Sequence, residues 1–270
     1  MLITLGELRA DFVPPESRKF KAPVVMVHEL WSSSAQWSEW ANHLANLGWE
    51  CWAVNLPGRA NDSRARARPT FSACVDELGK ALRNISFPPV LLAHGLGALV
   101  ASKAAERAQV TALVFVSPHS AQAADALRLL RLKYFALRWF RRPILLQEKD
   151  FRELFLASVR ESRRAEILKR FVPESADLAR EFLRPELAPG LARPTCPALV
   201  IGGTEDKIAP VSVLRASAHA MGADFLVFEN HGHWIMEEGD GERIVGDIHR
   251  WLVHKLGEGI LTAEFPHGTP

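Results

Sequence analysis

Short, continuous runs of apolar residues alternate with helical patterns along most of this 270-residue chain, and this alternation constrains its fold most strongly. The first clear run is Val24–Val27, a helical pattern follows from about residue 35 to 47, and Cys51–Val54 is the second run. Strands that are apolar at every position are typical of parallel sheets with helices on both faces. The sequence therefore predicts an α/β fold with a mostly parallel central sheet.

The alternation continues to residue 116, stops in the middle of the chain and then returns. Residues 119–194 have the pattern of several helices, whereas strand–helix alternation resumes at residue 198. We therefore expect one α/β core, made of residues 1–118 and 195–270, interrupted by a helical insertion over residues 119–194. The further expected elements are helices at about 71–85, 97–108, 211–220 and 241–254 and strands at 90–93, 110–116, 198–201 and 225–228.

Charge and cysteine content exclude several other classes of protein. The 33 basic and 31 acidic residues are too balanced to suggest nucleic-acid binding. The three cysteines, Cys51, Cys74 and Cys196, are widely spaced, which favours a reducing compartment over a disulfide framework or a zinc site. Acidic residues lie where a signal peptide needs an apolar core, and no apolar run approaches the roughly 18–20 residues of a membrane span. We expect a cytoplasmic protein without a transmembrane segment, metal or cofactor.

Polar residues that follow the predicted strands are the candidates for a functional site, because ligands of such sheets bind at the carboxyl ends of the strands. The segment 93–97 (Ala-His-Gly-Leu-Gly) joins a strand to a helix, where a small-x-Ser-x-small turn would carry a nucleophile. Asp206 and His233 follow two later strands, with Glu205 as an alternative acid. In this order a carboxylate would fix the imidazole tautomer and the imidazole would move a proton.

These segments resemble the α/β-hydrolase superfamily, in particular its lidded esterase and lysophospholipase-like members. The resemblance covers about residues 22–256 and includes the stretches 28–37, 55–59, 93–97, 203–210 and 232–234. It implies the α/β-hydrolase fold with residues 119–194 as a helical lid, and Asp206 and His233 as acid and base. The residues that it places at the pocket or oxyanion site are His28, Leu30, Trp31, Leu96, Ser117 and Trp234.

Two positions depart from the family pattern. Gly95 stands where the family has its nucleophile, and a glycine has no atom that can attack a carbonyl, although it tolerates the strained backbone of such a turn. Glu29 stands in the oxyanion segment, where a carboxylate would repel a developing oxyanion. Glu29 could instead act as an acid or base, or it could turn to solvent or pair with an arginine such as Arg59.

Other side chains are weaker candidates for the missing nucleophile. Ser32, Ser33 and Ser34 follow the first strand, but Ser33 and Gln36 have the spacing of a capping box, so a helix cap is the simpler interpretation. Ser102 lies about 10 Å along the helix that follows the turn, which is too far from it. The cysteines at 51 and 74 have the pattern of core residues, His94 of a packing residue and His231 of a loop residue.

The insertion is basic, with a local net charge of +6 between residues 119 and 194 that comes from 16 basic and 10 acidic side chains. Within it, residues 127–142 mix bulky apolar side chains with arginines, the pattern of a basic amphipathic helix. Such a helix can touch a membrane surface weakly or bind anionic ligands, or it can cover the pocket with its arginines in solvent. We expect a small-molecule ligand or substrate and no nucleic acid; the sequence sets no oligomeric state.

Three functions remain open at this point. The first is an enzyme that acts on a small apolar or amphipathic acyl or carbonyl compound without a serine nucleophile, with Asp206 and His233 as general base. The second is a catalytically silent relative that binds a ligand or partner. The third is a serine hydrolase disabled by a Ser→Gly change at residue 95, against which Glu29 argues because it is a second, independent departure.

Overall fold

A single eight-stranded sheet organises the part of the chain that the computed structural model describes, which is residues 1–59, 69–119, 130, 133, 143–182 and 190–261. The strand order is β1-β2-β4-β3-β5-β6-β7-β8, and the neighbouring strands in the part β4-β3-β5-β6-β7-β8 are all parallel. The α/β-hydrolase fold class predicted above is therefore confirmed. The strands are β1 (Leu2–Leu5), β2 (Leu8–Val13), β3 (Val24–Val27), β4 (Cys51–Val54), β5 (Val90–His94), β6 (Ala112–Val116), β7 (Ala198–Gly203) and β8 (Asp224–Phe228).

Helices cover both faces of this sheet, which explains why the central strands are apolar throughout. Every residue of β3, β5 and β6 is buried. Helix α1 packs against α9, α2 packs against α3, and α8 packs on β7 and β8. The helices of the core are α1 (Ser38–Asn46), α2 (Phe71–Leu82), α3 (Leu96–Ala105), α8 (Val211–Met221) and α9 (Gly241–Leu256), with 3-10 turns η1 (Ser34–Trp37), η4 (Ile235–Glu237) and η5 (Gly257–Ile260).

An N-terminal hairpin extends the sheet, and the sequence pattern did not reveal it. Strands β1 and β2 are antiparallel, and β2 also runs antiparallel to β4, with Ala10 opposite Val54. In β2 only Leu8 and Ala10 are buried, and Asp11, Phe12 and Val13 are half-buried. Half-buried strands carry a weaker hydrophobic signal than the continuous runs of the core.

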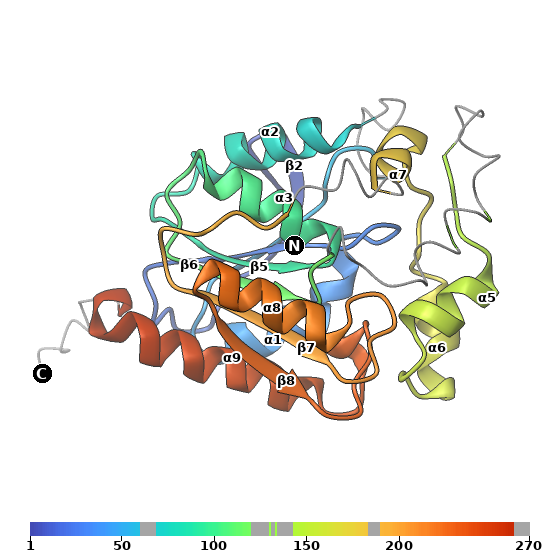
Figure 1. The fold of residues 1–270 in the computed structure, drawn as a ribbon. Helices are drawn as coiled ribbons and strands as arrows, with labels where there is room; N and C mark the ends of the chain where they lie inside the picture. Colours follow the sequence, from blue (N-terminus) through green and yellow to red (C-terminus); the bar gives the residue numbers. More distant parts are fainter. Residues whose placement is uncertain (60–68, 120–129, 131–132, 134–142, 183–189, 262–270) are drawn as a thin grey trace, which may run out of the picture.

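The described part of the insertion lies to one side of the sheet, on the right in Figure 1. It contains α5 (Glu148–Asp150), a π-helical turn η3 (Phe151–Phe155), α6 (Glu161–Leu168) and α7 (Ala176–Phe182). A buried, two-pronged ion pair ties it to the core: Arg59 Nη1 and Nη2 donate to Glu174 Oε1 and Oε2 at 2.9 and 2.7 Å. The amphipathic helix expected at 127–142 falls almost wholly outside the described residues. No helix among the described residues is long and apolar enough to cross a membrane.

Candidate active site

The segments that follow five strands bring together four ionisable side chains and one glycine. Glu29 follows β3, Gly95 follows β5, His119 follows β6, Asp206 follows β7 and His233 follows β8. The four side chains are buried, with at most 6% of any residue exposed. Parallel topology thus assembles a charged cluster from segments that are up to 204 residues apart in sequence.

Gly95 forms the turn between β5 and α3, and its backbone has φ +54° and ψ −116°. This positive φ agrees with the expectation that the turn favours glycine. A second reason is steric, because a Cβ built on Gly95 would lie 1.2 Å from Glu29 Oε2. The Glu29 carboxylate therefore occupies the space in which any side chain at residue 95 would begin.

Backbone N–H groups on both sides of the turn hold the Glu29 carboxylate. Oε1 accepts hydrogen bonds from Leu30 N at 2.5 Å and from Leu96 N at 3.2 Å, and Oε2 lies 3.2 Å from Leu96 N. Leu30 and Leu96 are the residues predicted to form the oxyanion site, so their donors now face a carboxylate. Glu29 is neither turned to solvent nor paired with Arg59, and both of those expectations are wrong.

Two imidazoles contact the same carboxylate oxygen. His233 Nε2 lies 3.3 Å and His119 Nε2 lies 2.6 Å from Glu29 Oε2. His233 Nδ1 donates to Asp206, 2.9 Å from Oδ2 and 3.1 Å from Oδ1. Asp206 Oδ1 also accepts from the backbone N–H of Ile208 and Ala209, both at 2.8 Å. The result is a continuous chain of carboxylate, imidazole and carboxylate through Asp206 rather than Glu205.

Opposite charges stabilise this cluster against the cost of burying it. Burial opposes a charge on His233, but the carboxylates of Asp206 and Glu29 raise the pKa of His233 to about 10. Burial would raise the pKa of Glu29, yet His119 and His233 hold it well below its ordinary value. The pKa of Asp206 is lowered by His233 in the same way, against the effect of burial. At neutral pH an imidazolium lies between two carboxylates.

Two other histidines near the cluster are structural. Burial, together with the nearby charge of His233, lowers the pKa of His94 to about 3, and its Nε2 lies 2.9 Å from the His233 carbonyl oxygen. His28 Nε2 accepts from Leu56 N at 3.0 Å, and burial followed by the charge of Arg59 holds its pKa well below its ordinary value. Both rings are therefore neutral at physiological pH and fix loops of the site.

The remaining predicted residues make other contacts around the cluster. Trp31 is fully buried with φ +56°, and its Nε1 donates to the Ile144 carbonyl at 2.9 Å. Ser117 is buried with φ +42°, and its hydroxyl has no hydrogen-bond partner within the described ranges. Trp234 packs its ring at 5.2 Å from the His94 ring. Ser102 accepts from Ala192 N, away from the cluster.

The predicted capping box at Ser33 and Gln36 is wrong. Ser33 makes no side-chain cap hydrogen bond. Gln36 Oε1 instead accepts from Glu29 N at 3.1 Å, and its Nε2 lies 3.4 Å from His94 Nδ1. Gln36 therefore supports the Glu29 loop rather than a helix terminus, and this role depends on a contact that sequence spacing cannot show.

His119 is a site residue to which the sequence analysis assigned no role. It belongs to the strand end at residues 117–119, which made it a candidate by position, but no motif gave it a function. It lies three residues after the end of β6. Its backbone N–H donates to the Gly95 carbonyl at 3.3 Å, which ties His119 to the turn it faces.

Three side chains lie close enough together to hold a metal ion. Glu29, His94 and His233 each offer one ligand atom, and these atoms lie within 4.8 Å of one another. However, His94 is already hydrogen-bonded to the His233 carbonyl, and Glu29 and His233 neutralise each other directly. The side chains that a metal would need are therefore already held in these contacts. The absence of a metal stays a prediction.

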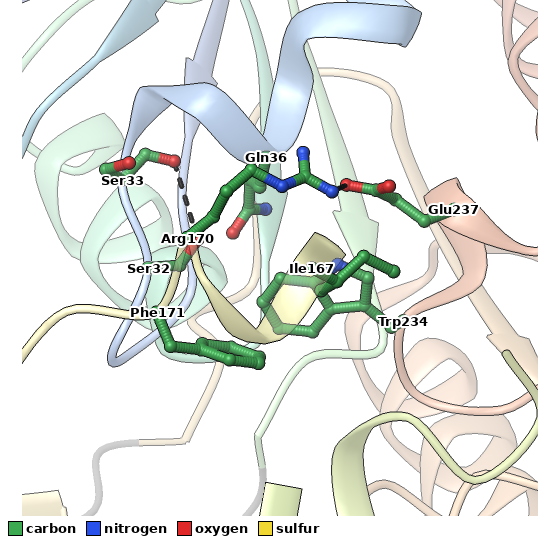
Figure 2. Close-up of a pocket in the computed structure, with 8 residues that line it drawn as sticks. All are labelled: Ser32, Ser33, Gln36, Ile167, Arg170, Phe171, Trp234 and Glu237. Carbon is green, nitrogen blue, oxygen red and sulfur yellow. Dashed lines mark hydrogen bonds and ion pairs between the residues drawn. The ribbon is translucent and has the colours of Figure 1, made fainter. Parts of the chain in front are cut away.

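A small cavity lies beside the cluster, and Figure 2 shows the side chains that surround it. It has room for about one water molecule. Arg170 Nη2 donates to Glu237 Oε1 at 2.5 Å across one side, while the Phe171 and Trp234 rings lie 5.1 Å apart on another. The lining residues are Ser32, Ser33, Gln36, Ile167, Arg170, Phe171, Trp234 and Glu237.

Comparison with solved structures identifies many chains of the same fold. An esterase from Thermogutta terrifontis is 19% identical with a TM-score of 0.71, over 94% of this chain and 98% of that one. MenH from S. aureus is 18% identical with a TM-score of 0.74, over 91% and 98%. BpoC from Mycobacterium tuberculosis, described as a putative non-heme bromoperoxidase, is 16% identical with a TM-score of 0.74, over 94% and 97%. At these identities the likeness shows the fold alone.

The family comparison covers most of the core and the site. No curated protein sequence matches the chain. A family model described as "Alpha/beta hydrolase family" matches residues 24–247, from β3 into the first half of α9, and so includes all five strand ends of the cluster. The chain therefore belongs to the alpha/beta hydrolase family.

Proposed function

We propose that this protein is a hydrolase whose nucleophile is the Glu29 carboxylate instead of a serine hydroxyl. We further propose that its substrate is a small apolar or amphipathic molecule with an electrophilic saturated carbon. The observation that carries this proposal is the position of Glu29 Oε2, which lies 1.2 Å from where a Cβ of residue 95 would be. A carboxylate thus takes the place of the nucleophile in this fold, with His233 and Asp206 behind it.

The charge of Glu29 favours a nucleophile over a general base. A general base works best when its pKa is close to the working pH, but the pKa of Glu29 lies well below its ordinary value. A nucleophilic carboxylate, by contrast, has to be ionised, and a low pKa keeps it so. The Asp206–His233 pair cannot act directly as the resting base either, because the pKa of His233 is about 10 and its Nε2 faces Glu29.

The hydrogen bonds of Glu29 favour a saturated carbon over an acyl carbon as the target. Attack on an acyl group develops an oxyanion on the substrate, which needs the N–H groups of Leu30 and Leu96. Glu29 Oε1 already accepts from both of them. Attack on a saturated carbon develops no such oxyanion, so those donors stay on Glu29. The acyl or carbonyl substrate expected from the sequence is therefore the less favoured of the two.

The reaction divides into two balanced steps. Glu29 Oε2 forms a bond to the substrate carbon as the bond to the leaving group breaks, which gives a neutral glutamyl ester and releases the leaving group with its electron pair. Loss of the Glu29 charge removes one of the two carboxylates that raise the pKa of His233, which favours release of its proton, and we propose that His233 gives this proton to solvent. Neutral His233 then takes a proton from water, the hydroxyl adds to the Glu29 carboxyl carbon, and Oε1 becomes an oxyanion held by Leu30 N and Leu96 N. Collapse of this oxyanion breaks the bond from the carboxyl carbon to Oε2, and the alcohol leaves with one proton as the new Glu29 carboxyl group gives one up and becomes a carboxylate again.

The disabled serine hydrolase is less consistent with this geometry. A serine at residue 95 would place its Cβ inside the Glu29 carboxylate, so restoring it does not restore a working site. The silent ligand-binding protein remains the alternative, and the observation that favours it is the carboxylate in the oxyanion site. Turnover that depends on Glu29 separates the two.

An isotope experiment tests the nucleophile directly. The protein is incubated in water labelled with 18O with 1-bromopropane, 1,2-epoxybutane and, for the acyl alternative, γ-butyrolactone, and the peptide that contains Glu29 is then analysed by mass spectrometry. We expect turnover of a halide or epoxide and 18O in the Glu29 carboxylate. Label in the product alone would show direct attack by water, with His233 as base, and would reject the nucleophile.

A trapping variant provides the second arm. His233→Gln removes the base of the second step but leaves the carboxylate, so the halide or epoxide should add one alkyl group to Glu29 and turnover should stop. His219→Gln, the same change on the exposed face of α8, should behave as the unmodified protein. If neither the unmodified protein nor His233→Gln is alkylated on Glu29 by any probe, the nucleophile is rejected, and if no probe is turned over either, the result supports the silent alternative.

A further inference from the structure

We propose that His119 is a second catalytic residue, the general acid that protonates Glu29 Oε2 when the glutamyl ester breaks down. This inference rests on the proposed function, since it concerns the fate of the ester. The acid is separate from the base: His233 serves the attacking water, and His119 serves the departing oxygen.

The identity of the departing atom follows from the first step. Oε2 attacks the substrate carbon, so in the ester Oε2 links the Glu29 carboxyl carbon to the alkyl group, and Oε1 is the carbonyl oxygen. When water adds to the carboxyl carbon and the intermediate collapses, the bond from that carbon to Oε2 breaks. Oε2 then leaves with the alkyl group as an alkoxide, which is a poor leaving group unless it receives a proton.

His119 contacts that atom. Its Nε2 lies 2.6 Å from Oε2, at ion-pair distance, and His119 is only 2% exposed. The hydrogen bond from His119 N to the Gly95 carbonyl and the buried end of β6 hold its position. His233 Nε2 is farther from Oε2, at 3.3 Å, which leaves it to the water.

The two rings can work at the same time. Their centroids are 5.4 Å apart and their planes are inclined at 62°, so they approach Oε2 from different directions. Asp206 supports His233 as it gains a proton from water. His119 meanwhile donates its Nε2 proton to Oε2.

The protons and atoms balance over this step. One water proton passes to His233 and the hydroxyl bonds to the Glu29 carboxyl carbon. The His119 proton passes to Oε2, which leaves in the product alcohol. The new Glu29 carboxylic acid then returns a proton to His119 Nε2, so that the Glu29 carboxylate and the His119 N–H that the step used are both restored.

The test measures ester formation and ester decay separately in the full-length protein. Rapid mixing with 1-bromopropane or 1-bromo-2-fluoroethane, followed by quenching and mass spectrometry, gives both rates for the unmodified protein, His119→Gln and the control His219→Gln. We expect His119→Gln to form the ester at close to the unmodified rate. Its decay should be slower by about 10²–10⁴-fold for the propyl ester, the range for loss of a general acid.

The fluorinated ester distinguishes an acid from a structural residue. Its alcohol is a better leaving group and needs the acid less, so His119→Gln should slow its decay much less than that of the propyl ester. Imidazole added to His119→Ala should restore part of the decay rate. Equal slowing of both esters, or of ester formation and decay alike, would show that His119 is only structural and would overturn the inference.

The two proposals fail in different ways. If His233→Gln accumulates an ester on Glu29 but His119→Gln releases its propyl ester at the unmodified rate, only the acid role is wrong. If no ester forms on Glu29 in any of these proteins, the nucleophile is wrong and the acid role is rejected with it.

Discussion

Gly95 and Glu29 are coupled because one space holds either a side chain at residue 95 or the Glu29 carboxylate. We predict that Gly95→Ala lowers the free energy of unfolding by about 2–4 kcal/mol, from overpacking and from a positive φ at a non-glycine residue. In a Glu29→Gly background only the backbone strain remains, so the same change should cost about 1–2 kcal/mol. Urea denaturation of the four proteins measures this, and equal costs in both backgrounds would contradict the coupling.

The same clash predicts the outcome of restoring a serine. Gly95→Ser alone should show no esterase activity towards 4-nitrophenyl acetate, because the Glu29 carboxylate blocks the hydroxyl and fills the oxyanion site. The double variant Glu29→Gly, Gly95→Ser removes the carboxylate from both the hydroxyl and the oxyanion site. It should therefore be more active than Gly95→Ser alone. Robust esterase activity from Gly95→Ser by itself would instead support a disabled serine hydrolase.

The charge on His233 predicts how stability depends on pH. Its pKa rises from an ordinary value of about 6.5 to about 10 on folding, so the His233 imidazole binds a proton more tightly in the native state than in the unfolded state. This contribution is complete below pH 6.5 and is lost as the pH rises from 6.5 to 10. We therefore predict that the free energy of unfolding falls more steeply over this range in the unmodified protein than in His233→Gln. Urea titrations at several pH values test this, with His219→Gln expected to follow the unmodified curve.

Single site residues were predictable from the sequence where a polar or unusual residue follows a predicted strand. Asp206, His233 and the anomalies at Glu29 and Gly95 could be selected in this way, and the structure brings all four together. The partner of Glu29 could not be predicted, because it depends on which loop folds over the strand ends. Arg59 was the candidate because it follows a neighbouring strand end, but it pairs with Glu174 of the insertion instead.

At the scale of elements, the Arg59–Glu174 pair joins the loop after β4 to the segment between α6 and α7. Arg59 and Glu174 side chains are 5% and 0% exposed, and Arg59 Nε also donates to the Ser32 carbonyl at 2.7 Å. We predict that Arg59→Ala costs about 3–5 kcal/mol, because it leaves Glu174 buried and unpaired. Chemical denaturation measures the loss.

An exposed ion pair of the same type provides the control for this prediction. Arg107 pairs with Asp76 at 2.8 Å, with side chains 64% and 47% exposed, so Arg107→Ala should cost at most about 1 kcal/mol. The double change Arg59→Met with Glu174→Gln should recover part of the stability, since no uncompensated charge remains. A loss for Arg59→Ala no larger than that for Arg107→Ala would show that the pair does not hold the insertion.

Helices and strands were predictable from the sequence where burial gives their apolar residues one clear pattern. The fully buried strands β3, β5 and β6 were located to within about two residues, because nothing but apolar side chains fits between two layers of helices. The predicted helix at 71–85 ends at Leu82, and the one at 97–108 is observed as Leu96–Ala105. Helix ends depend on local capping more than on the apolar stripe, so they are the less predictable part.

At the scale of the whole molecule, the N-terminal hairpin closes one edge of the sheet. Without it, β4 would present unpaired backbone groups, which favour association with other chains. The hairpin also reaches the site, since Arg9 O accepts from Asn55 N at 2.7 Å and Asp11 accepts from the Ser34 hydroxyl at 2.6 Å. The edge of the sheet and the loops beside Glu29 are therefore stabilised by the same few residues.

Two leucines of this hairpin make its contribution measurable without deleting it. Leu8 is 1% exposed in the core, whereas Leu2 is 45% exposed on the neighbouring strand. We predict that Leu8→Ser lowers the free energy of unfolding by about 2–5 kcal/mol and promotes association through the loosened edge, because a buried apolar side chain is lost and a hydroxyl is buried. Leu2→Ser, the same change on an exposed position, should stay within about 0.5 kcal/mol and remain unassociated. Urea denaturation measures the stability of the two variants, and light scattering measures their association. If Leu8→Ser is as stable and as little associated as Leu2→Ser, the hairpin does not protect the edge of the sheet at β4.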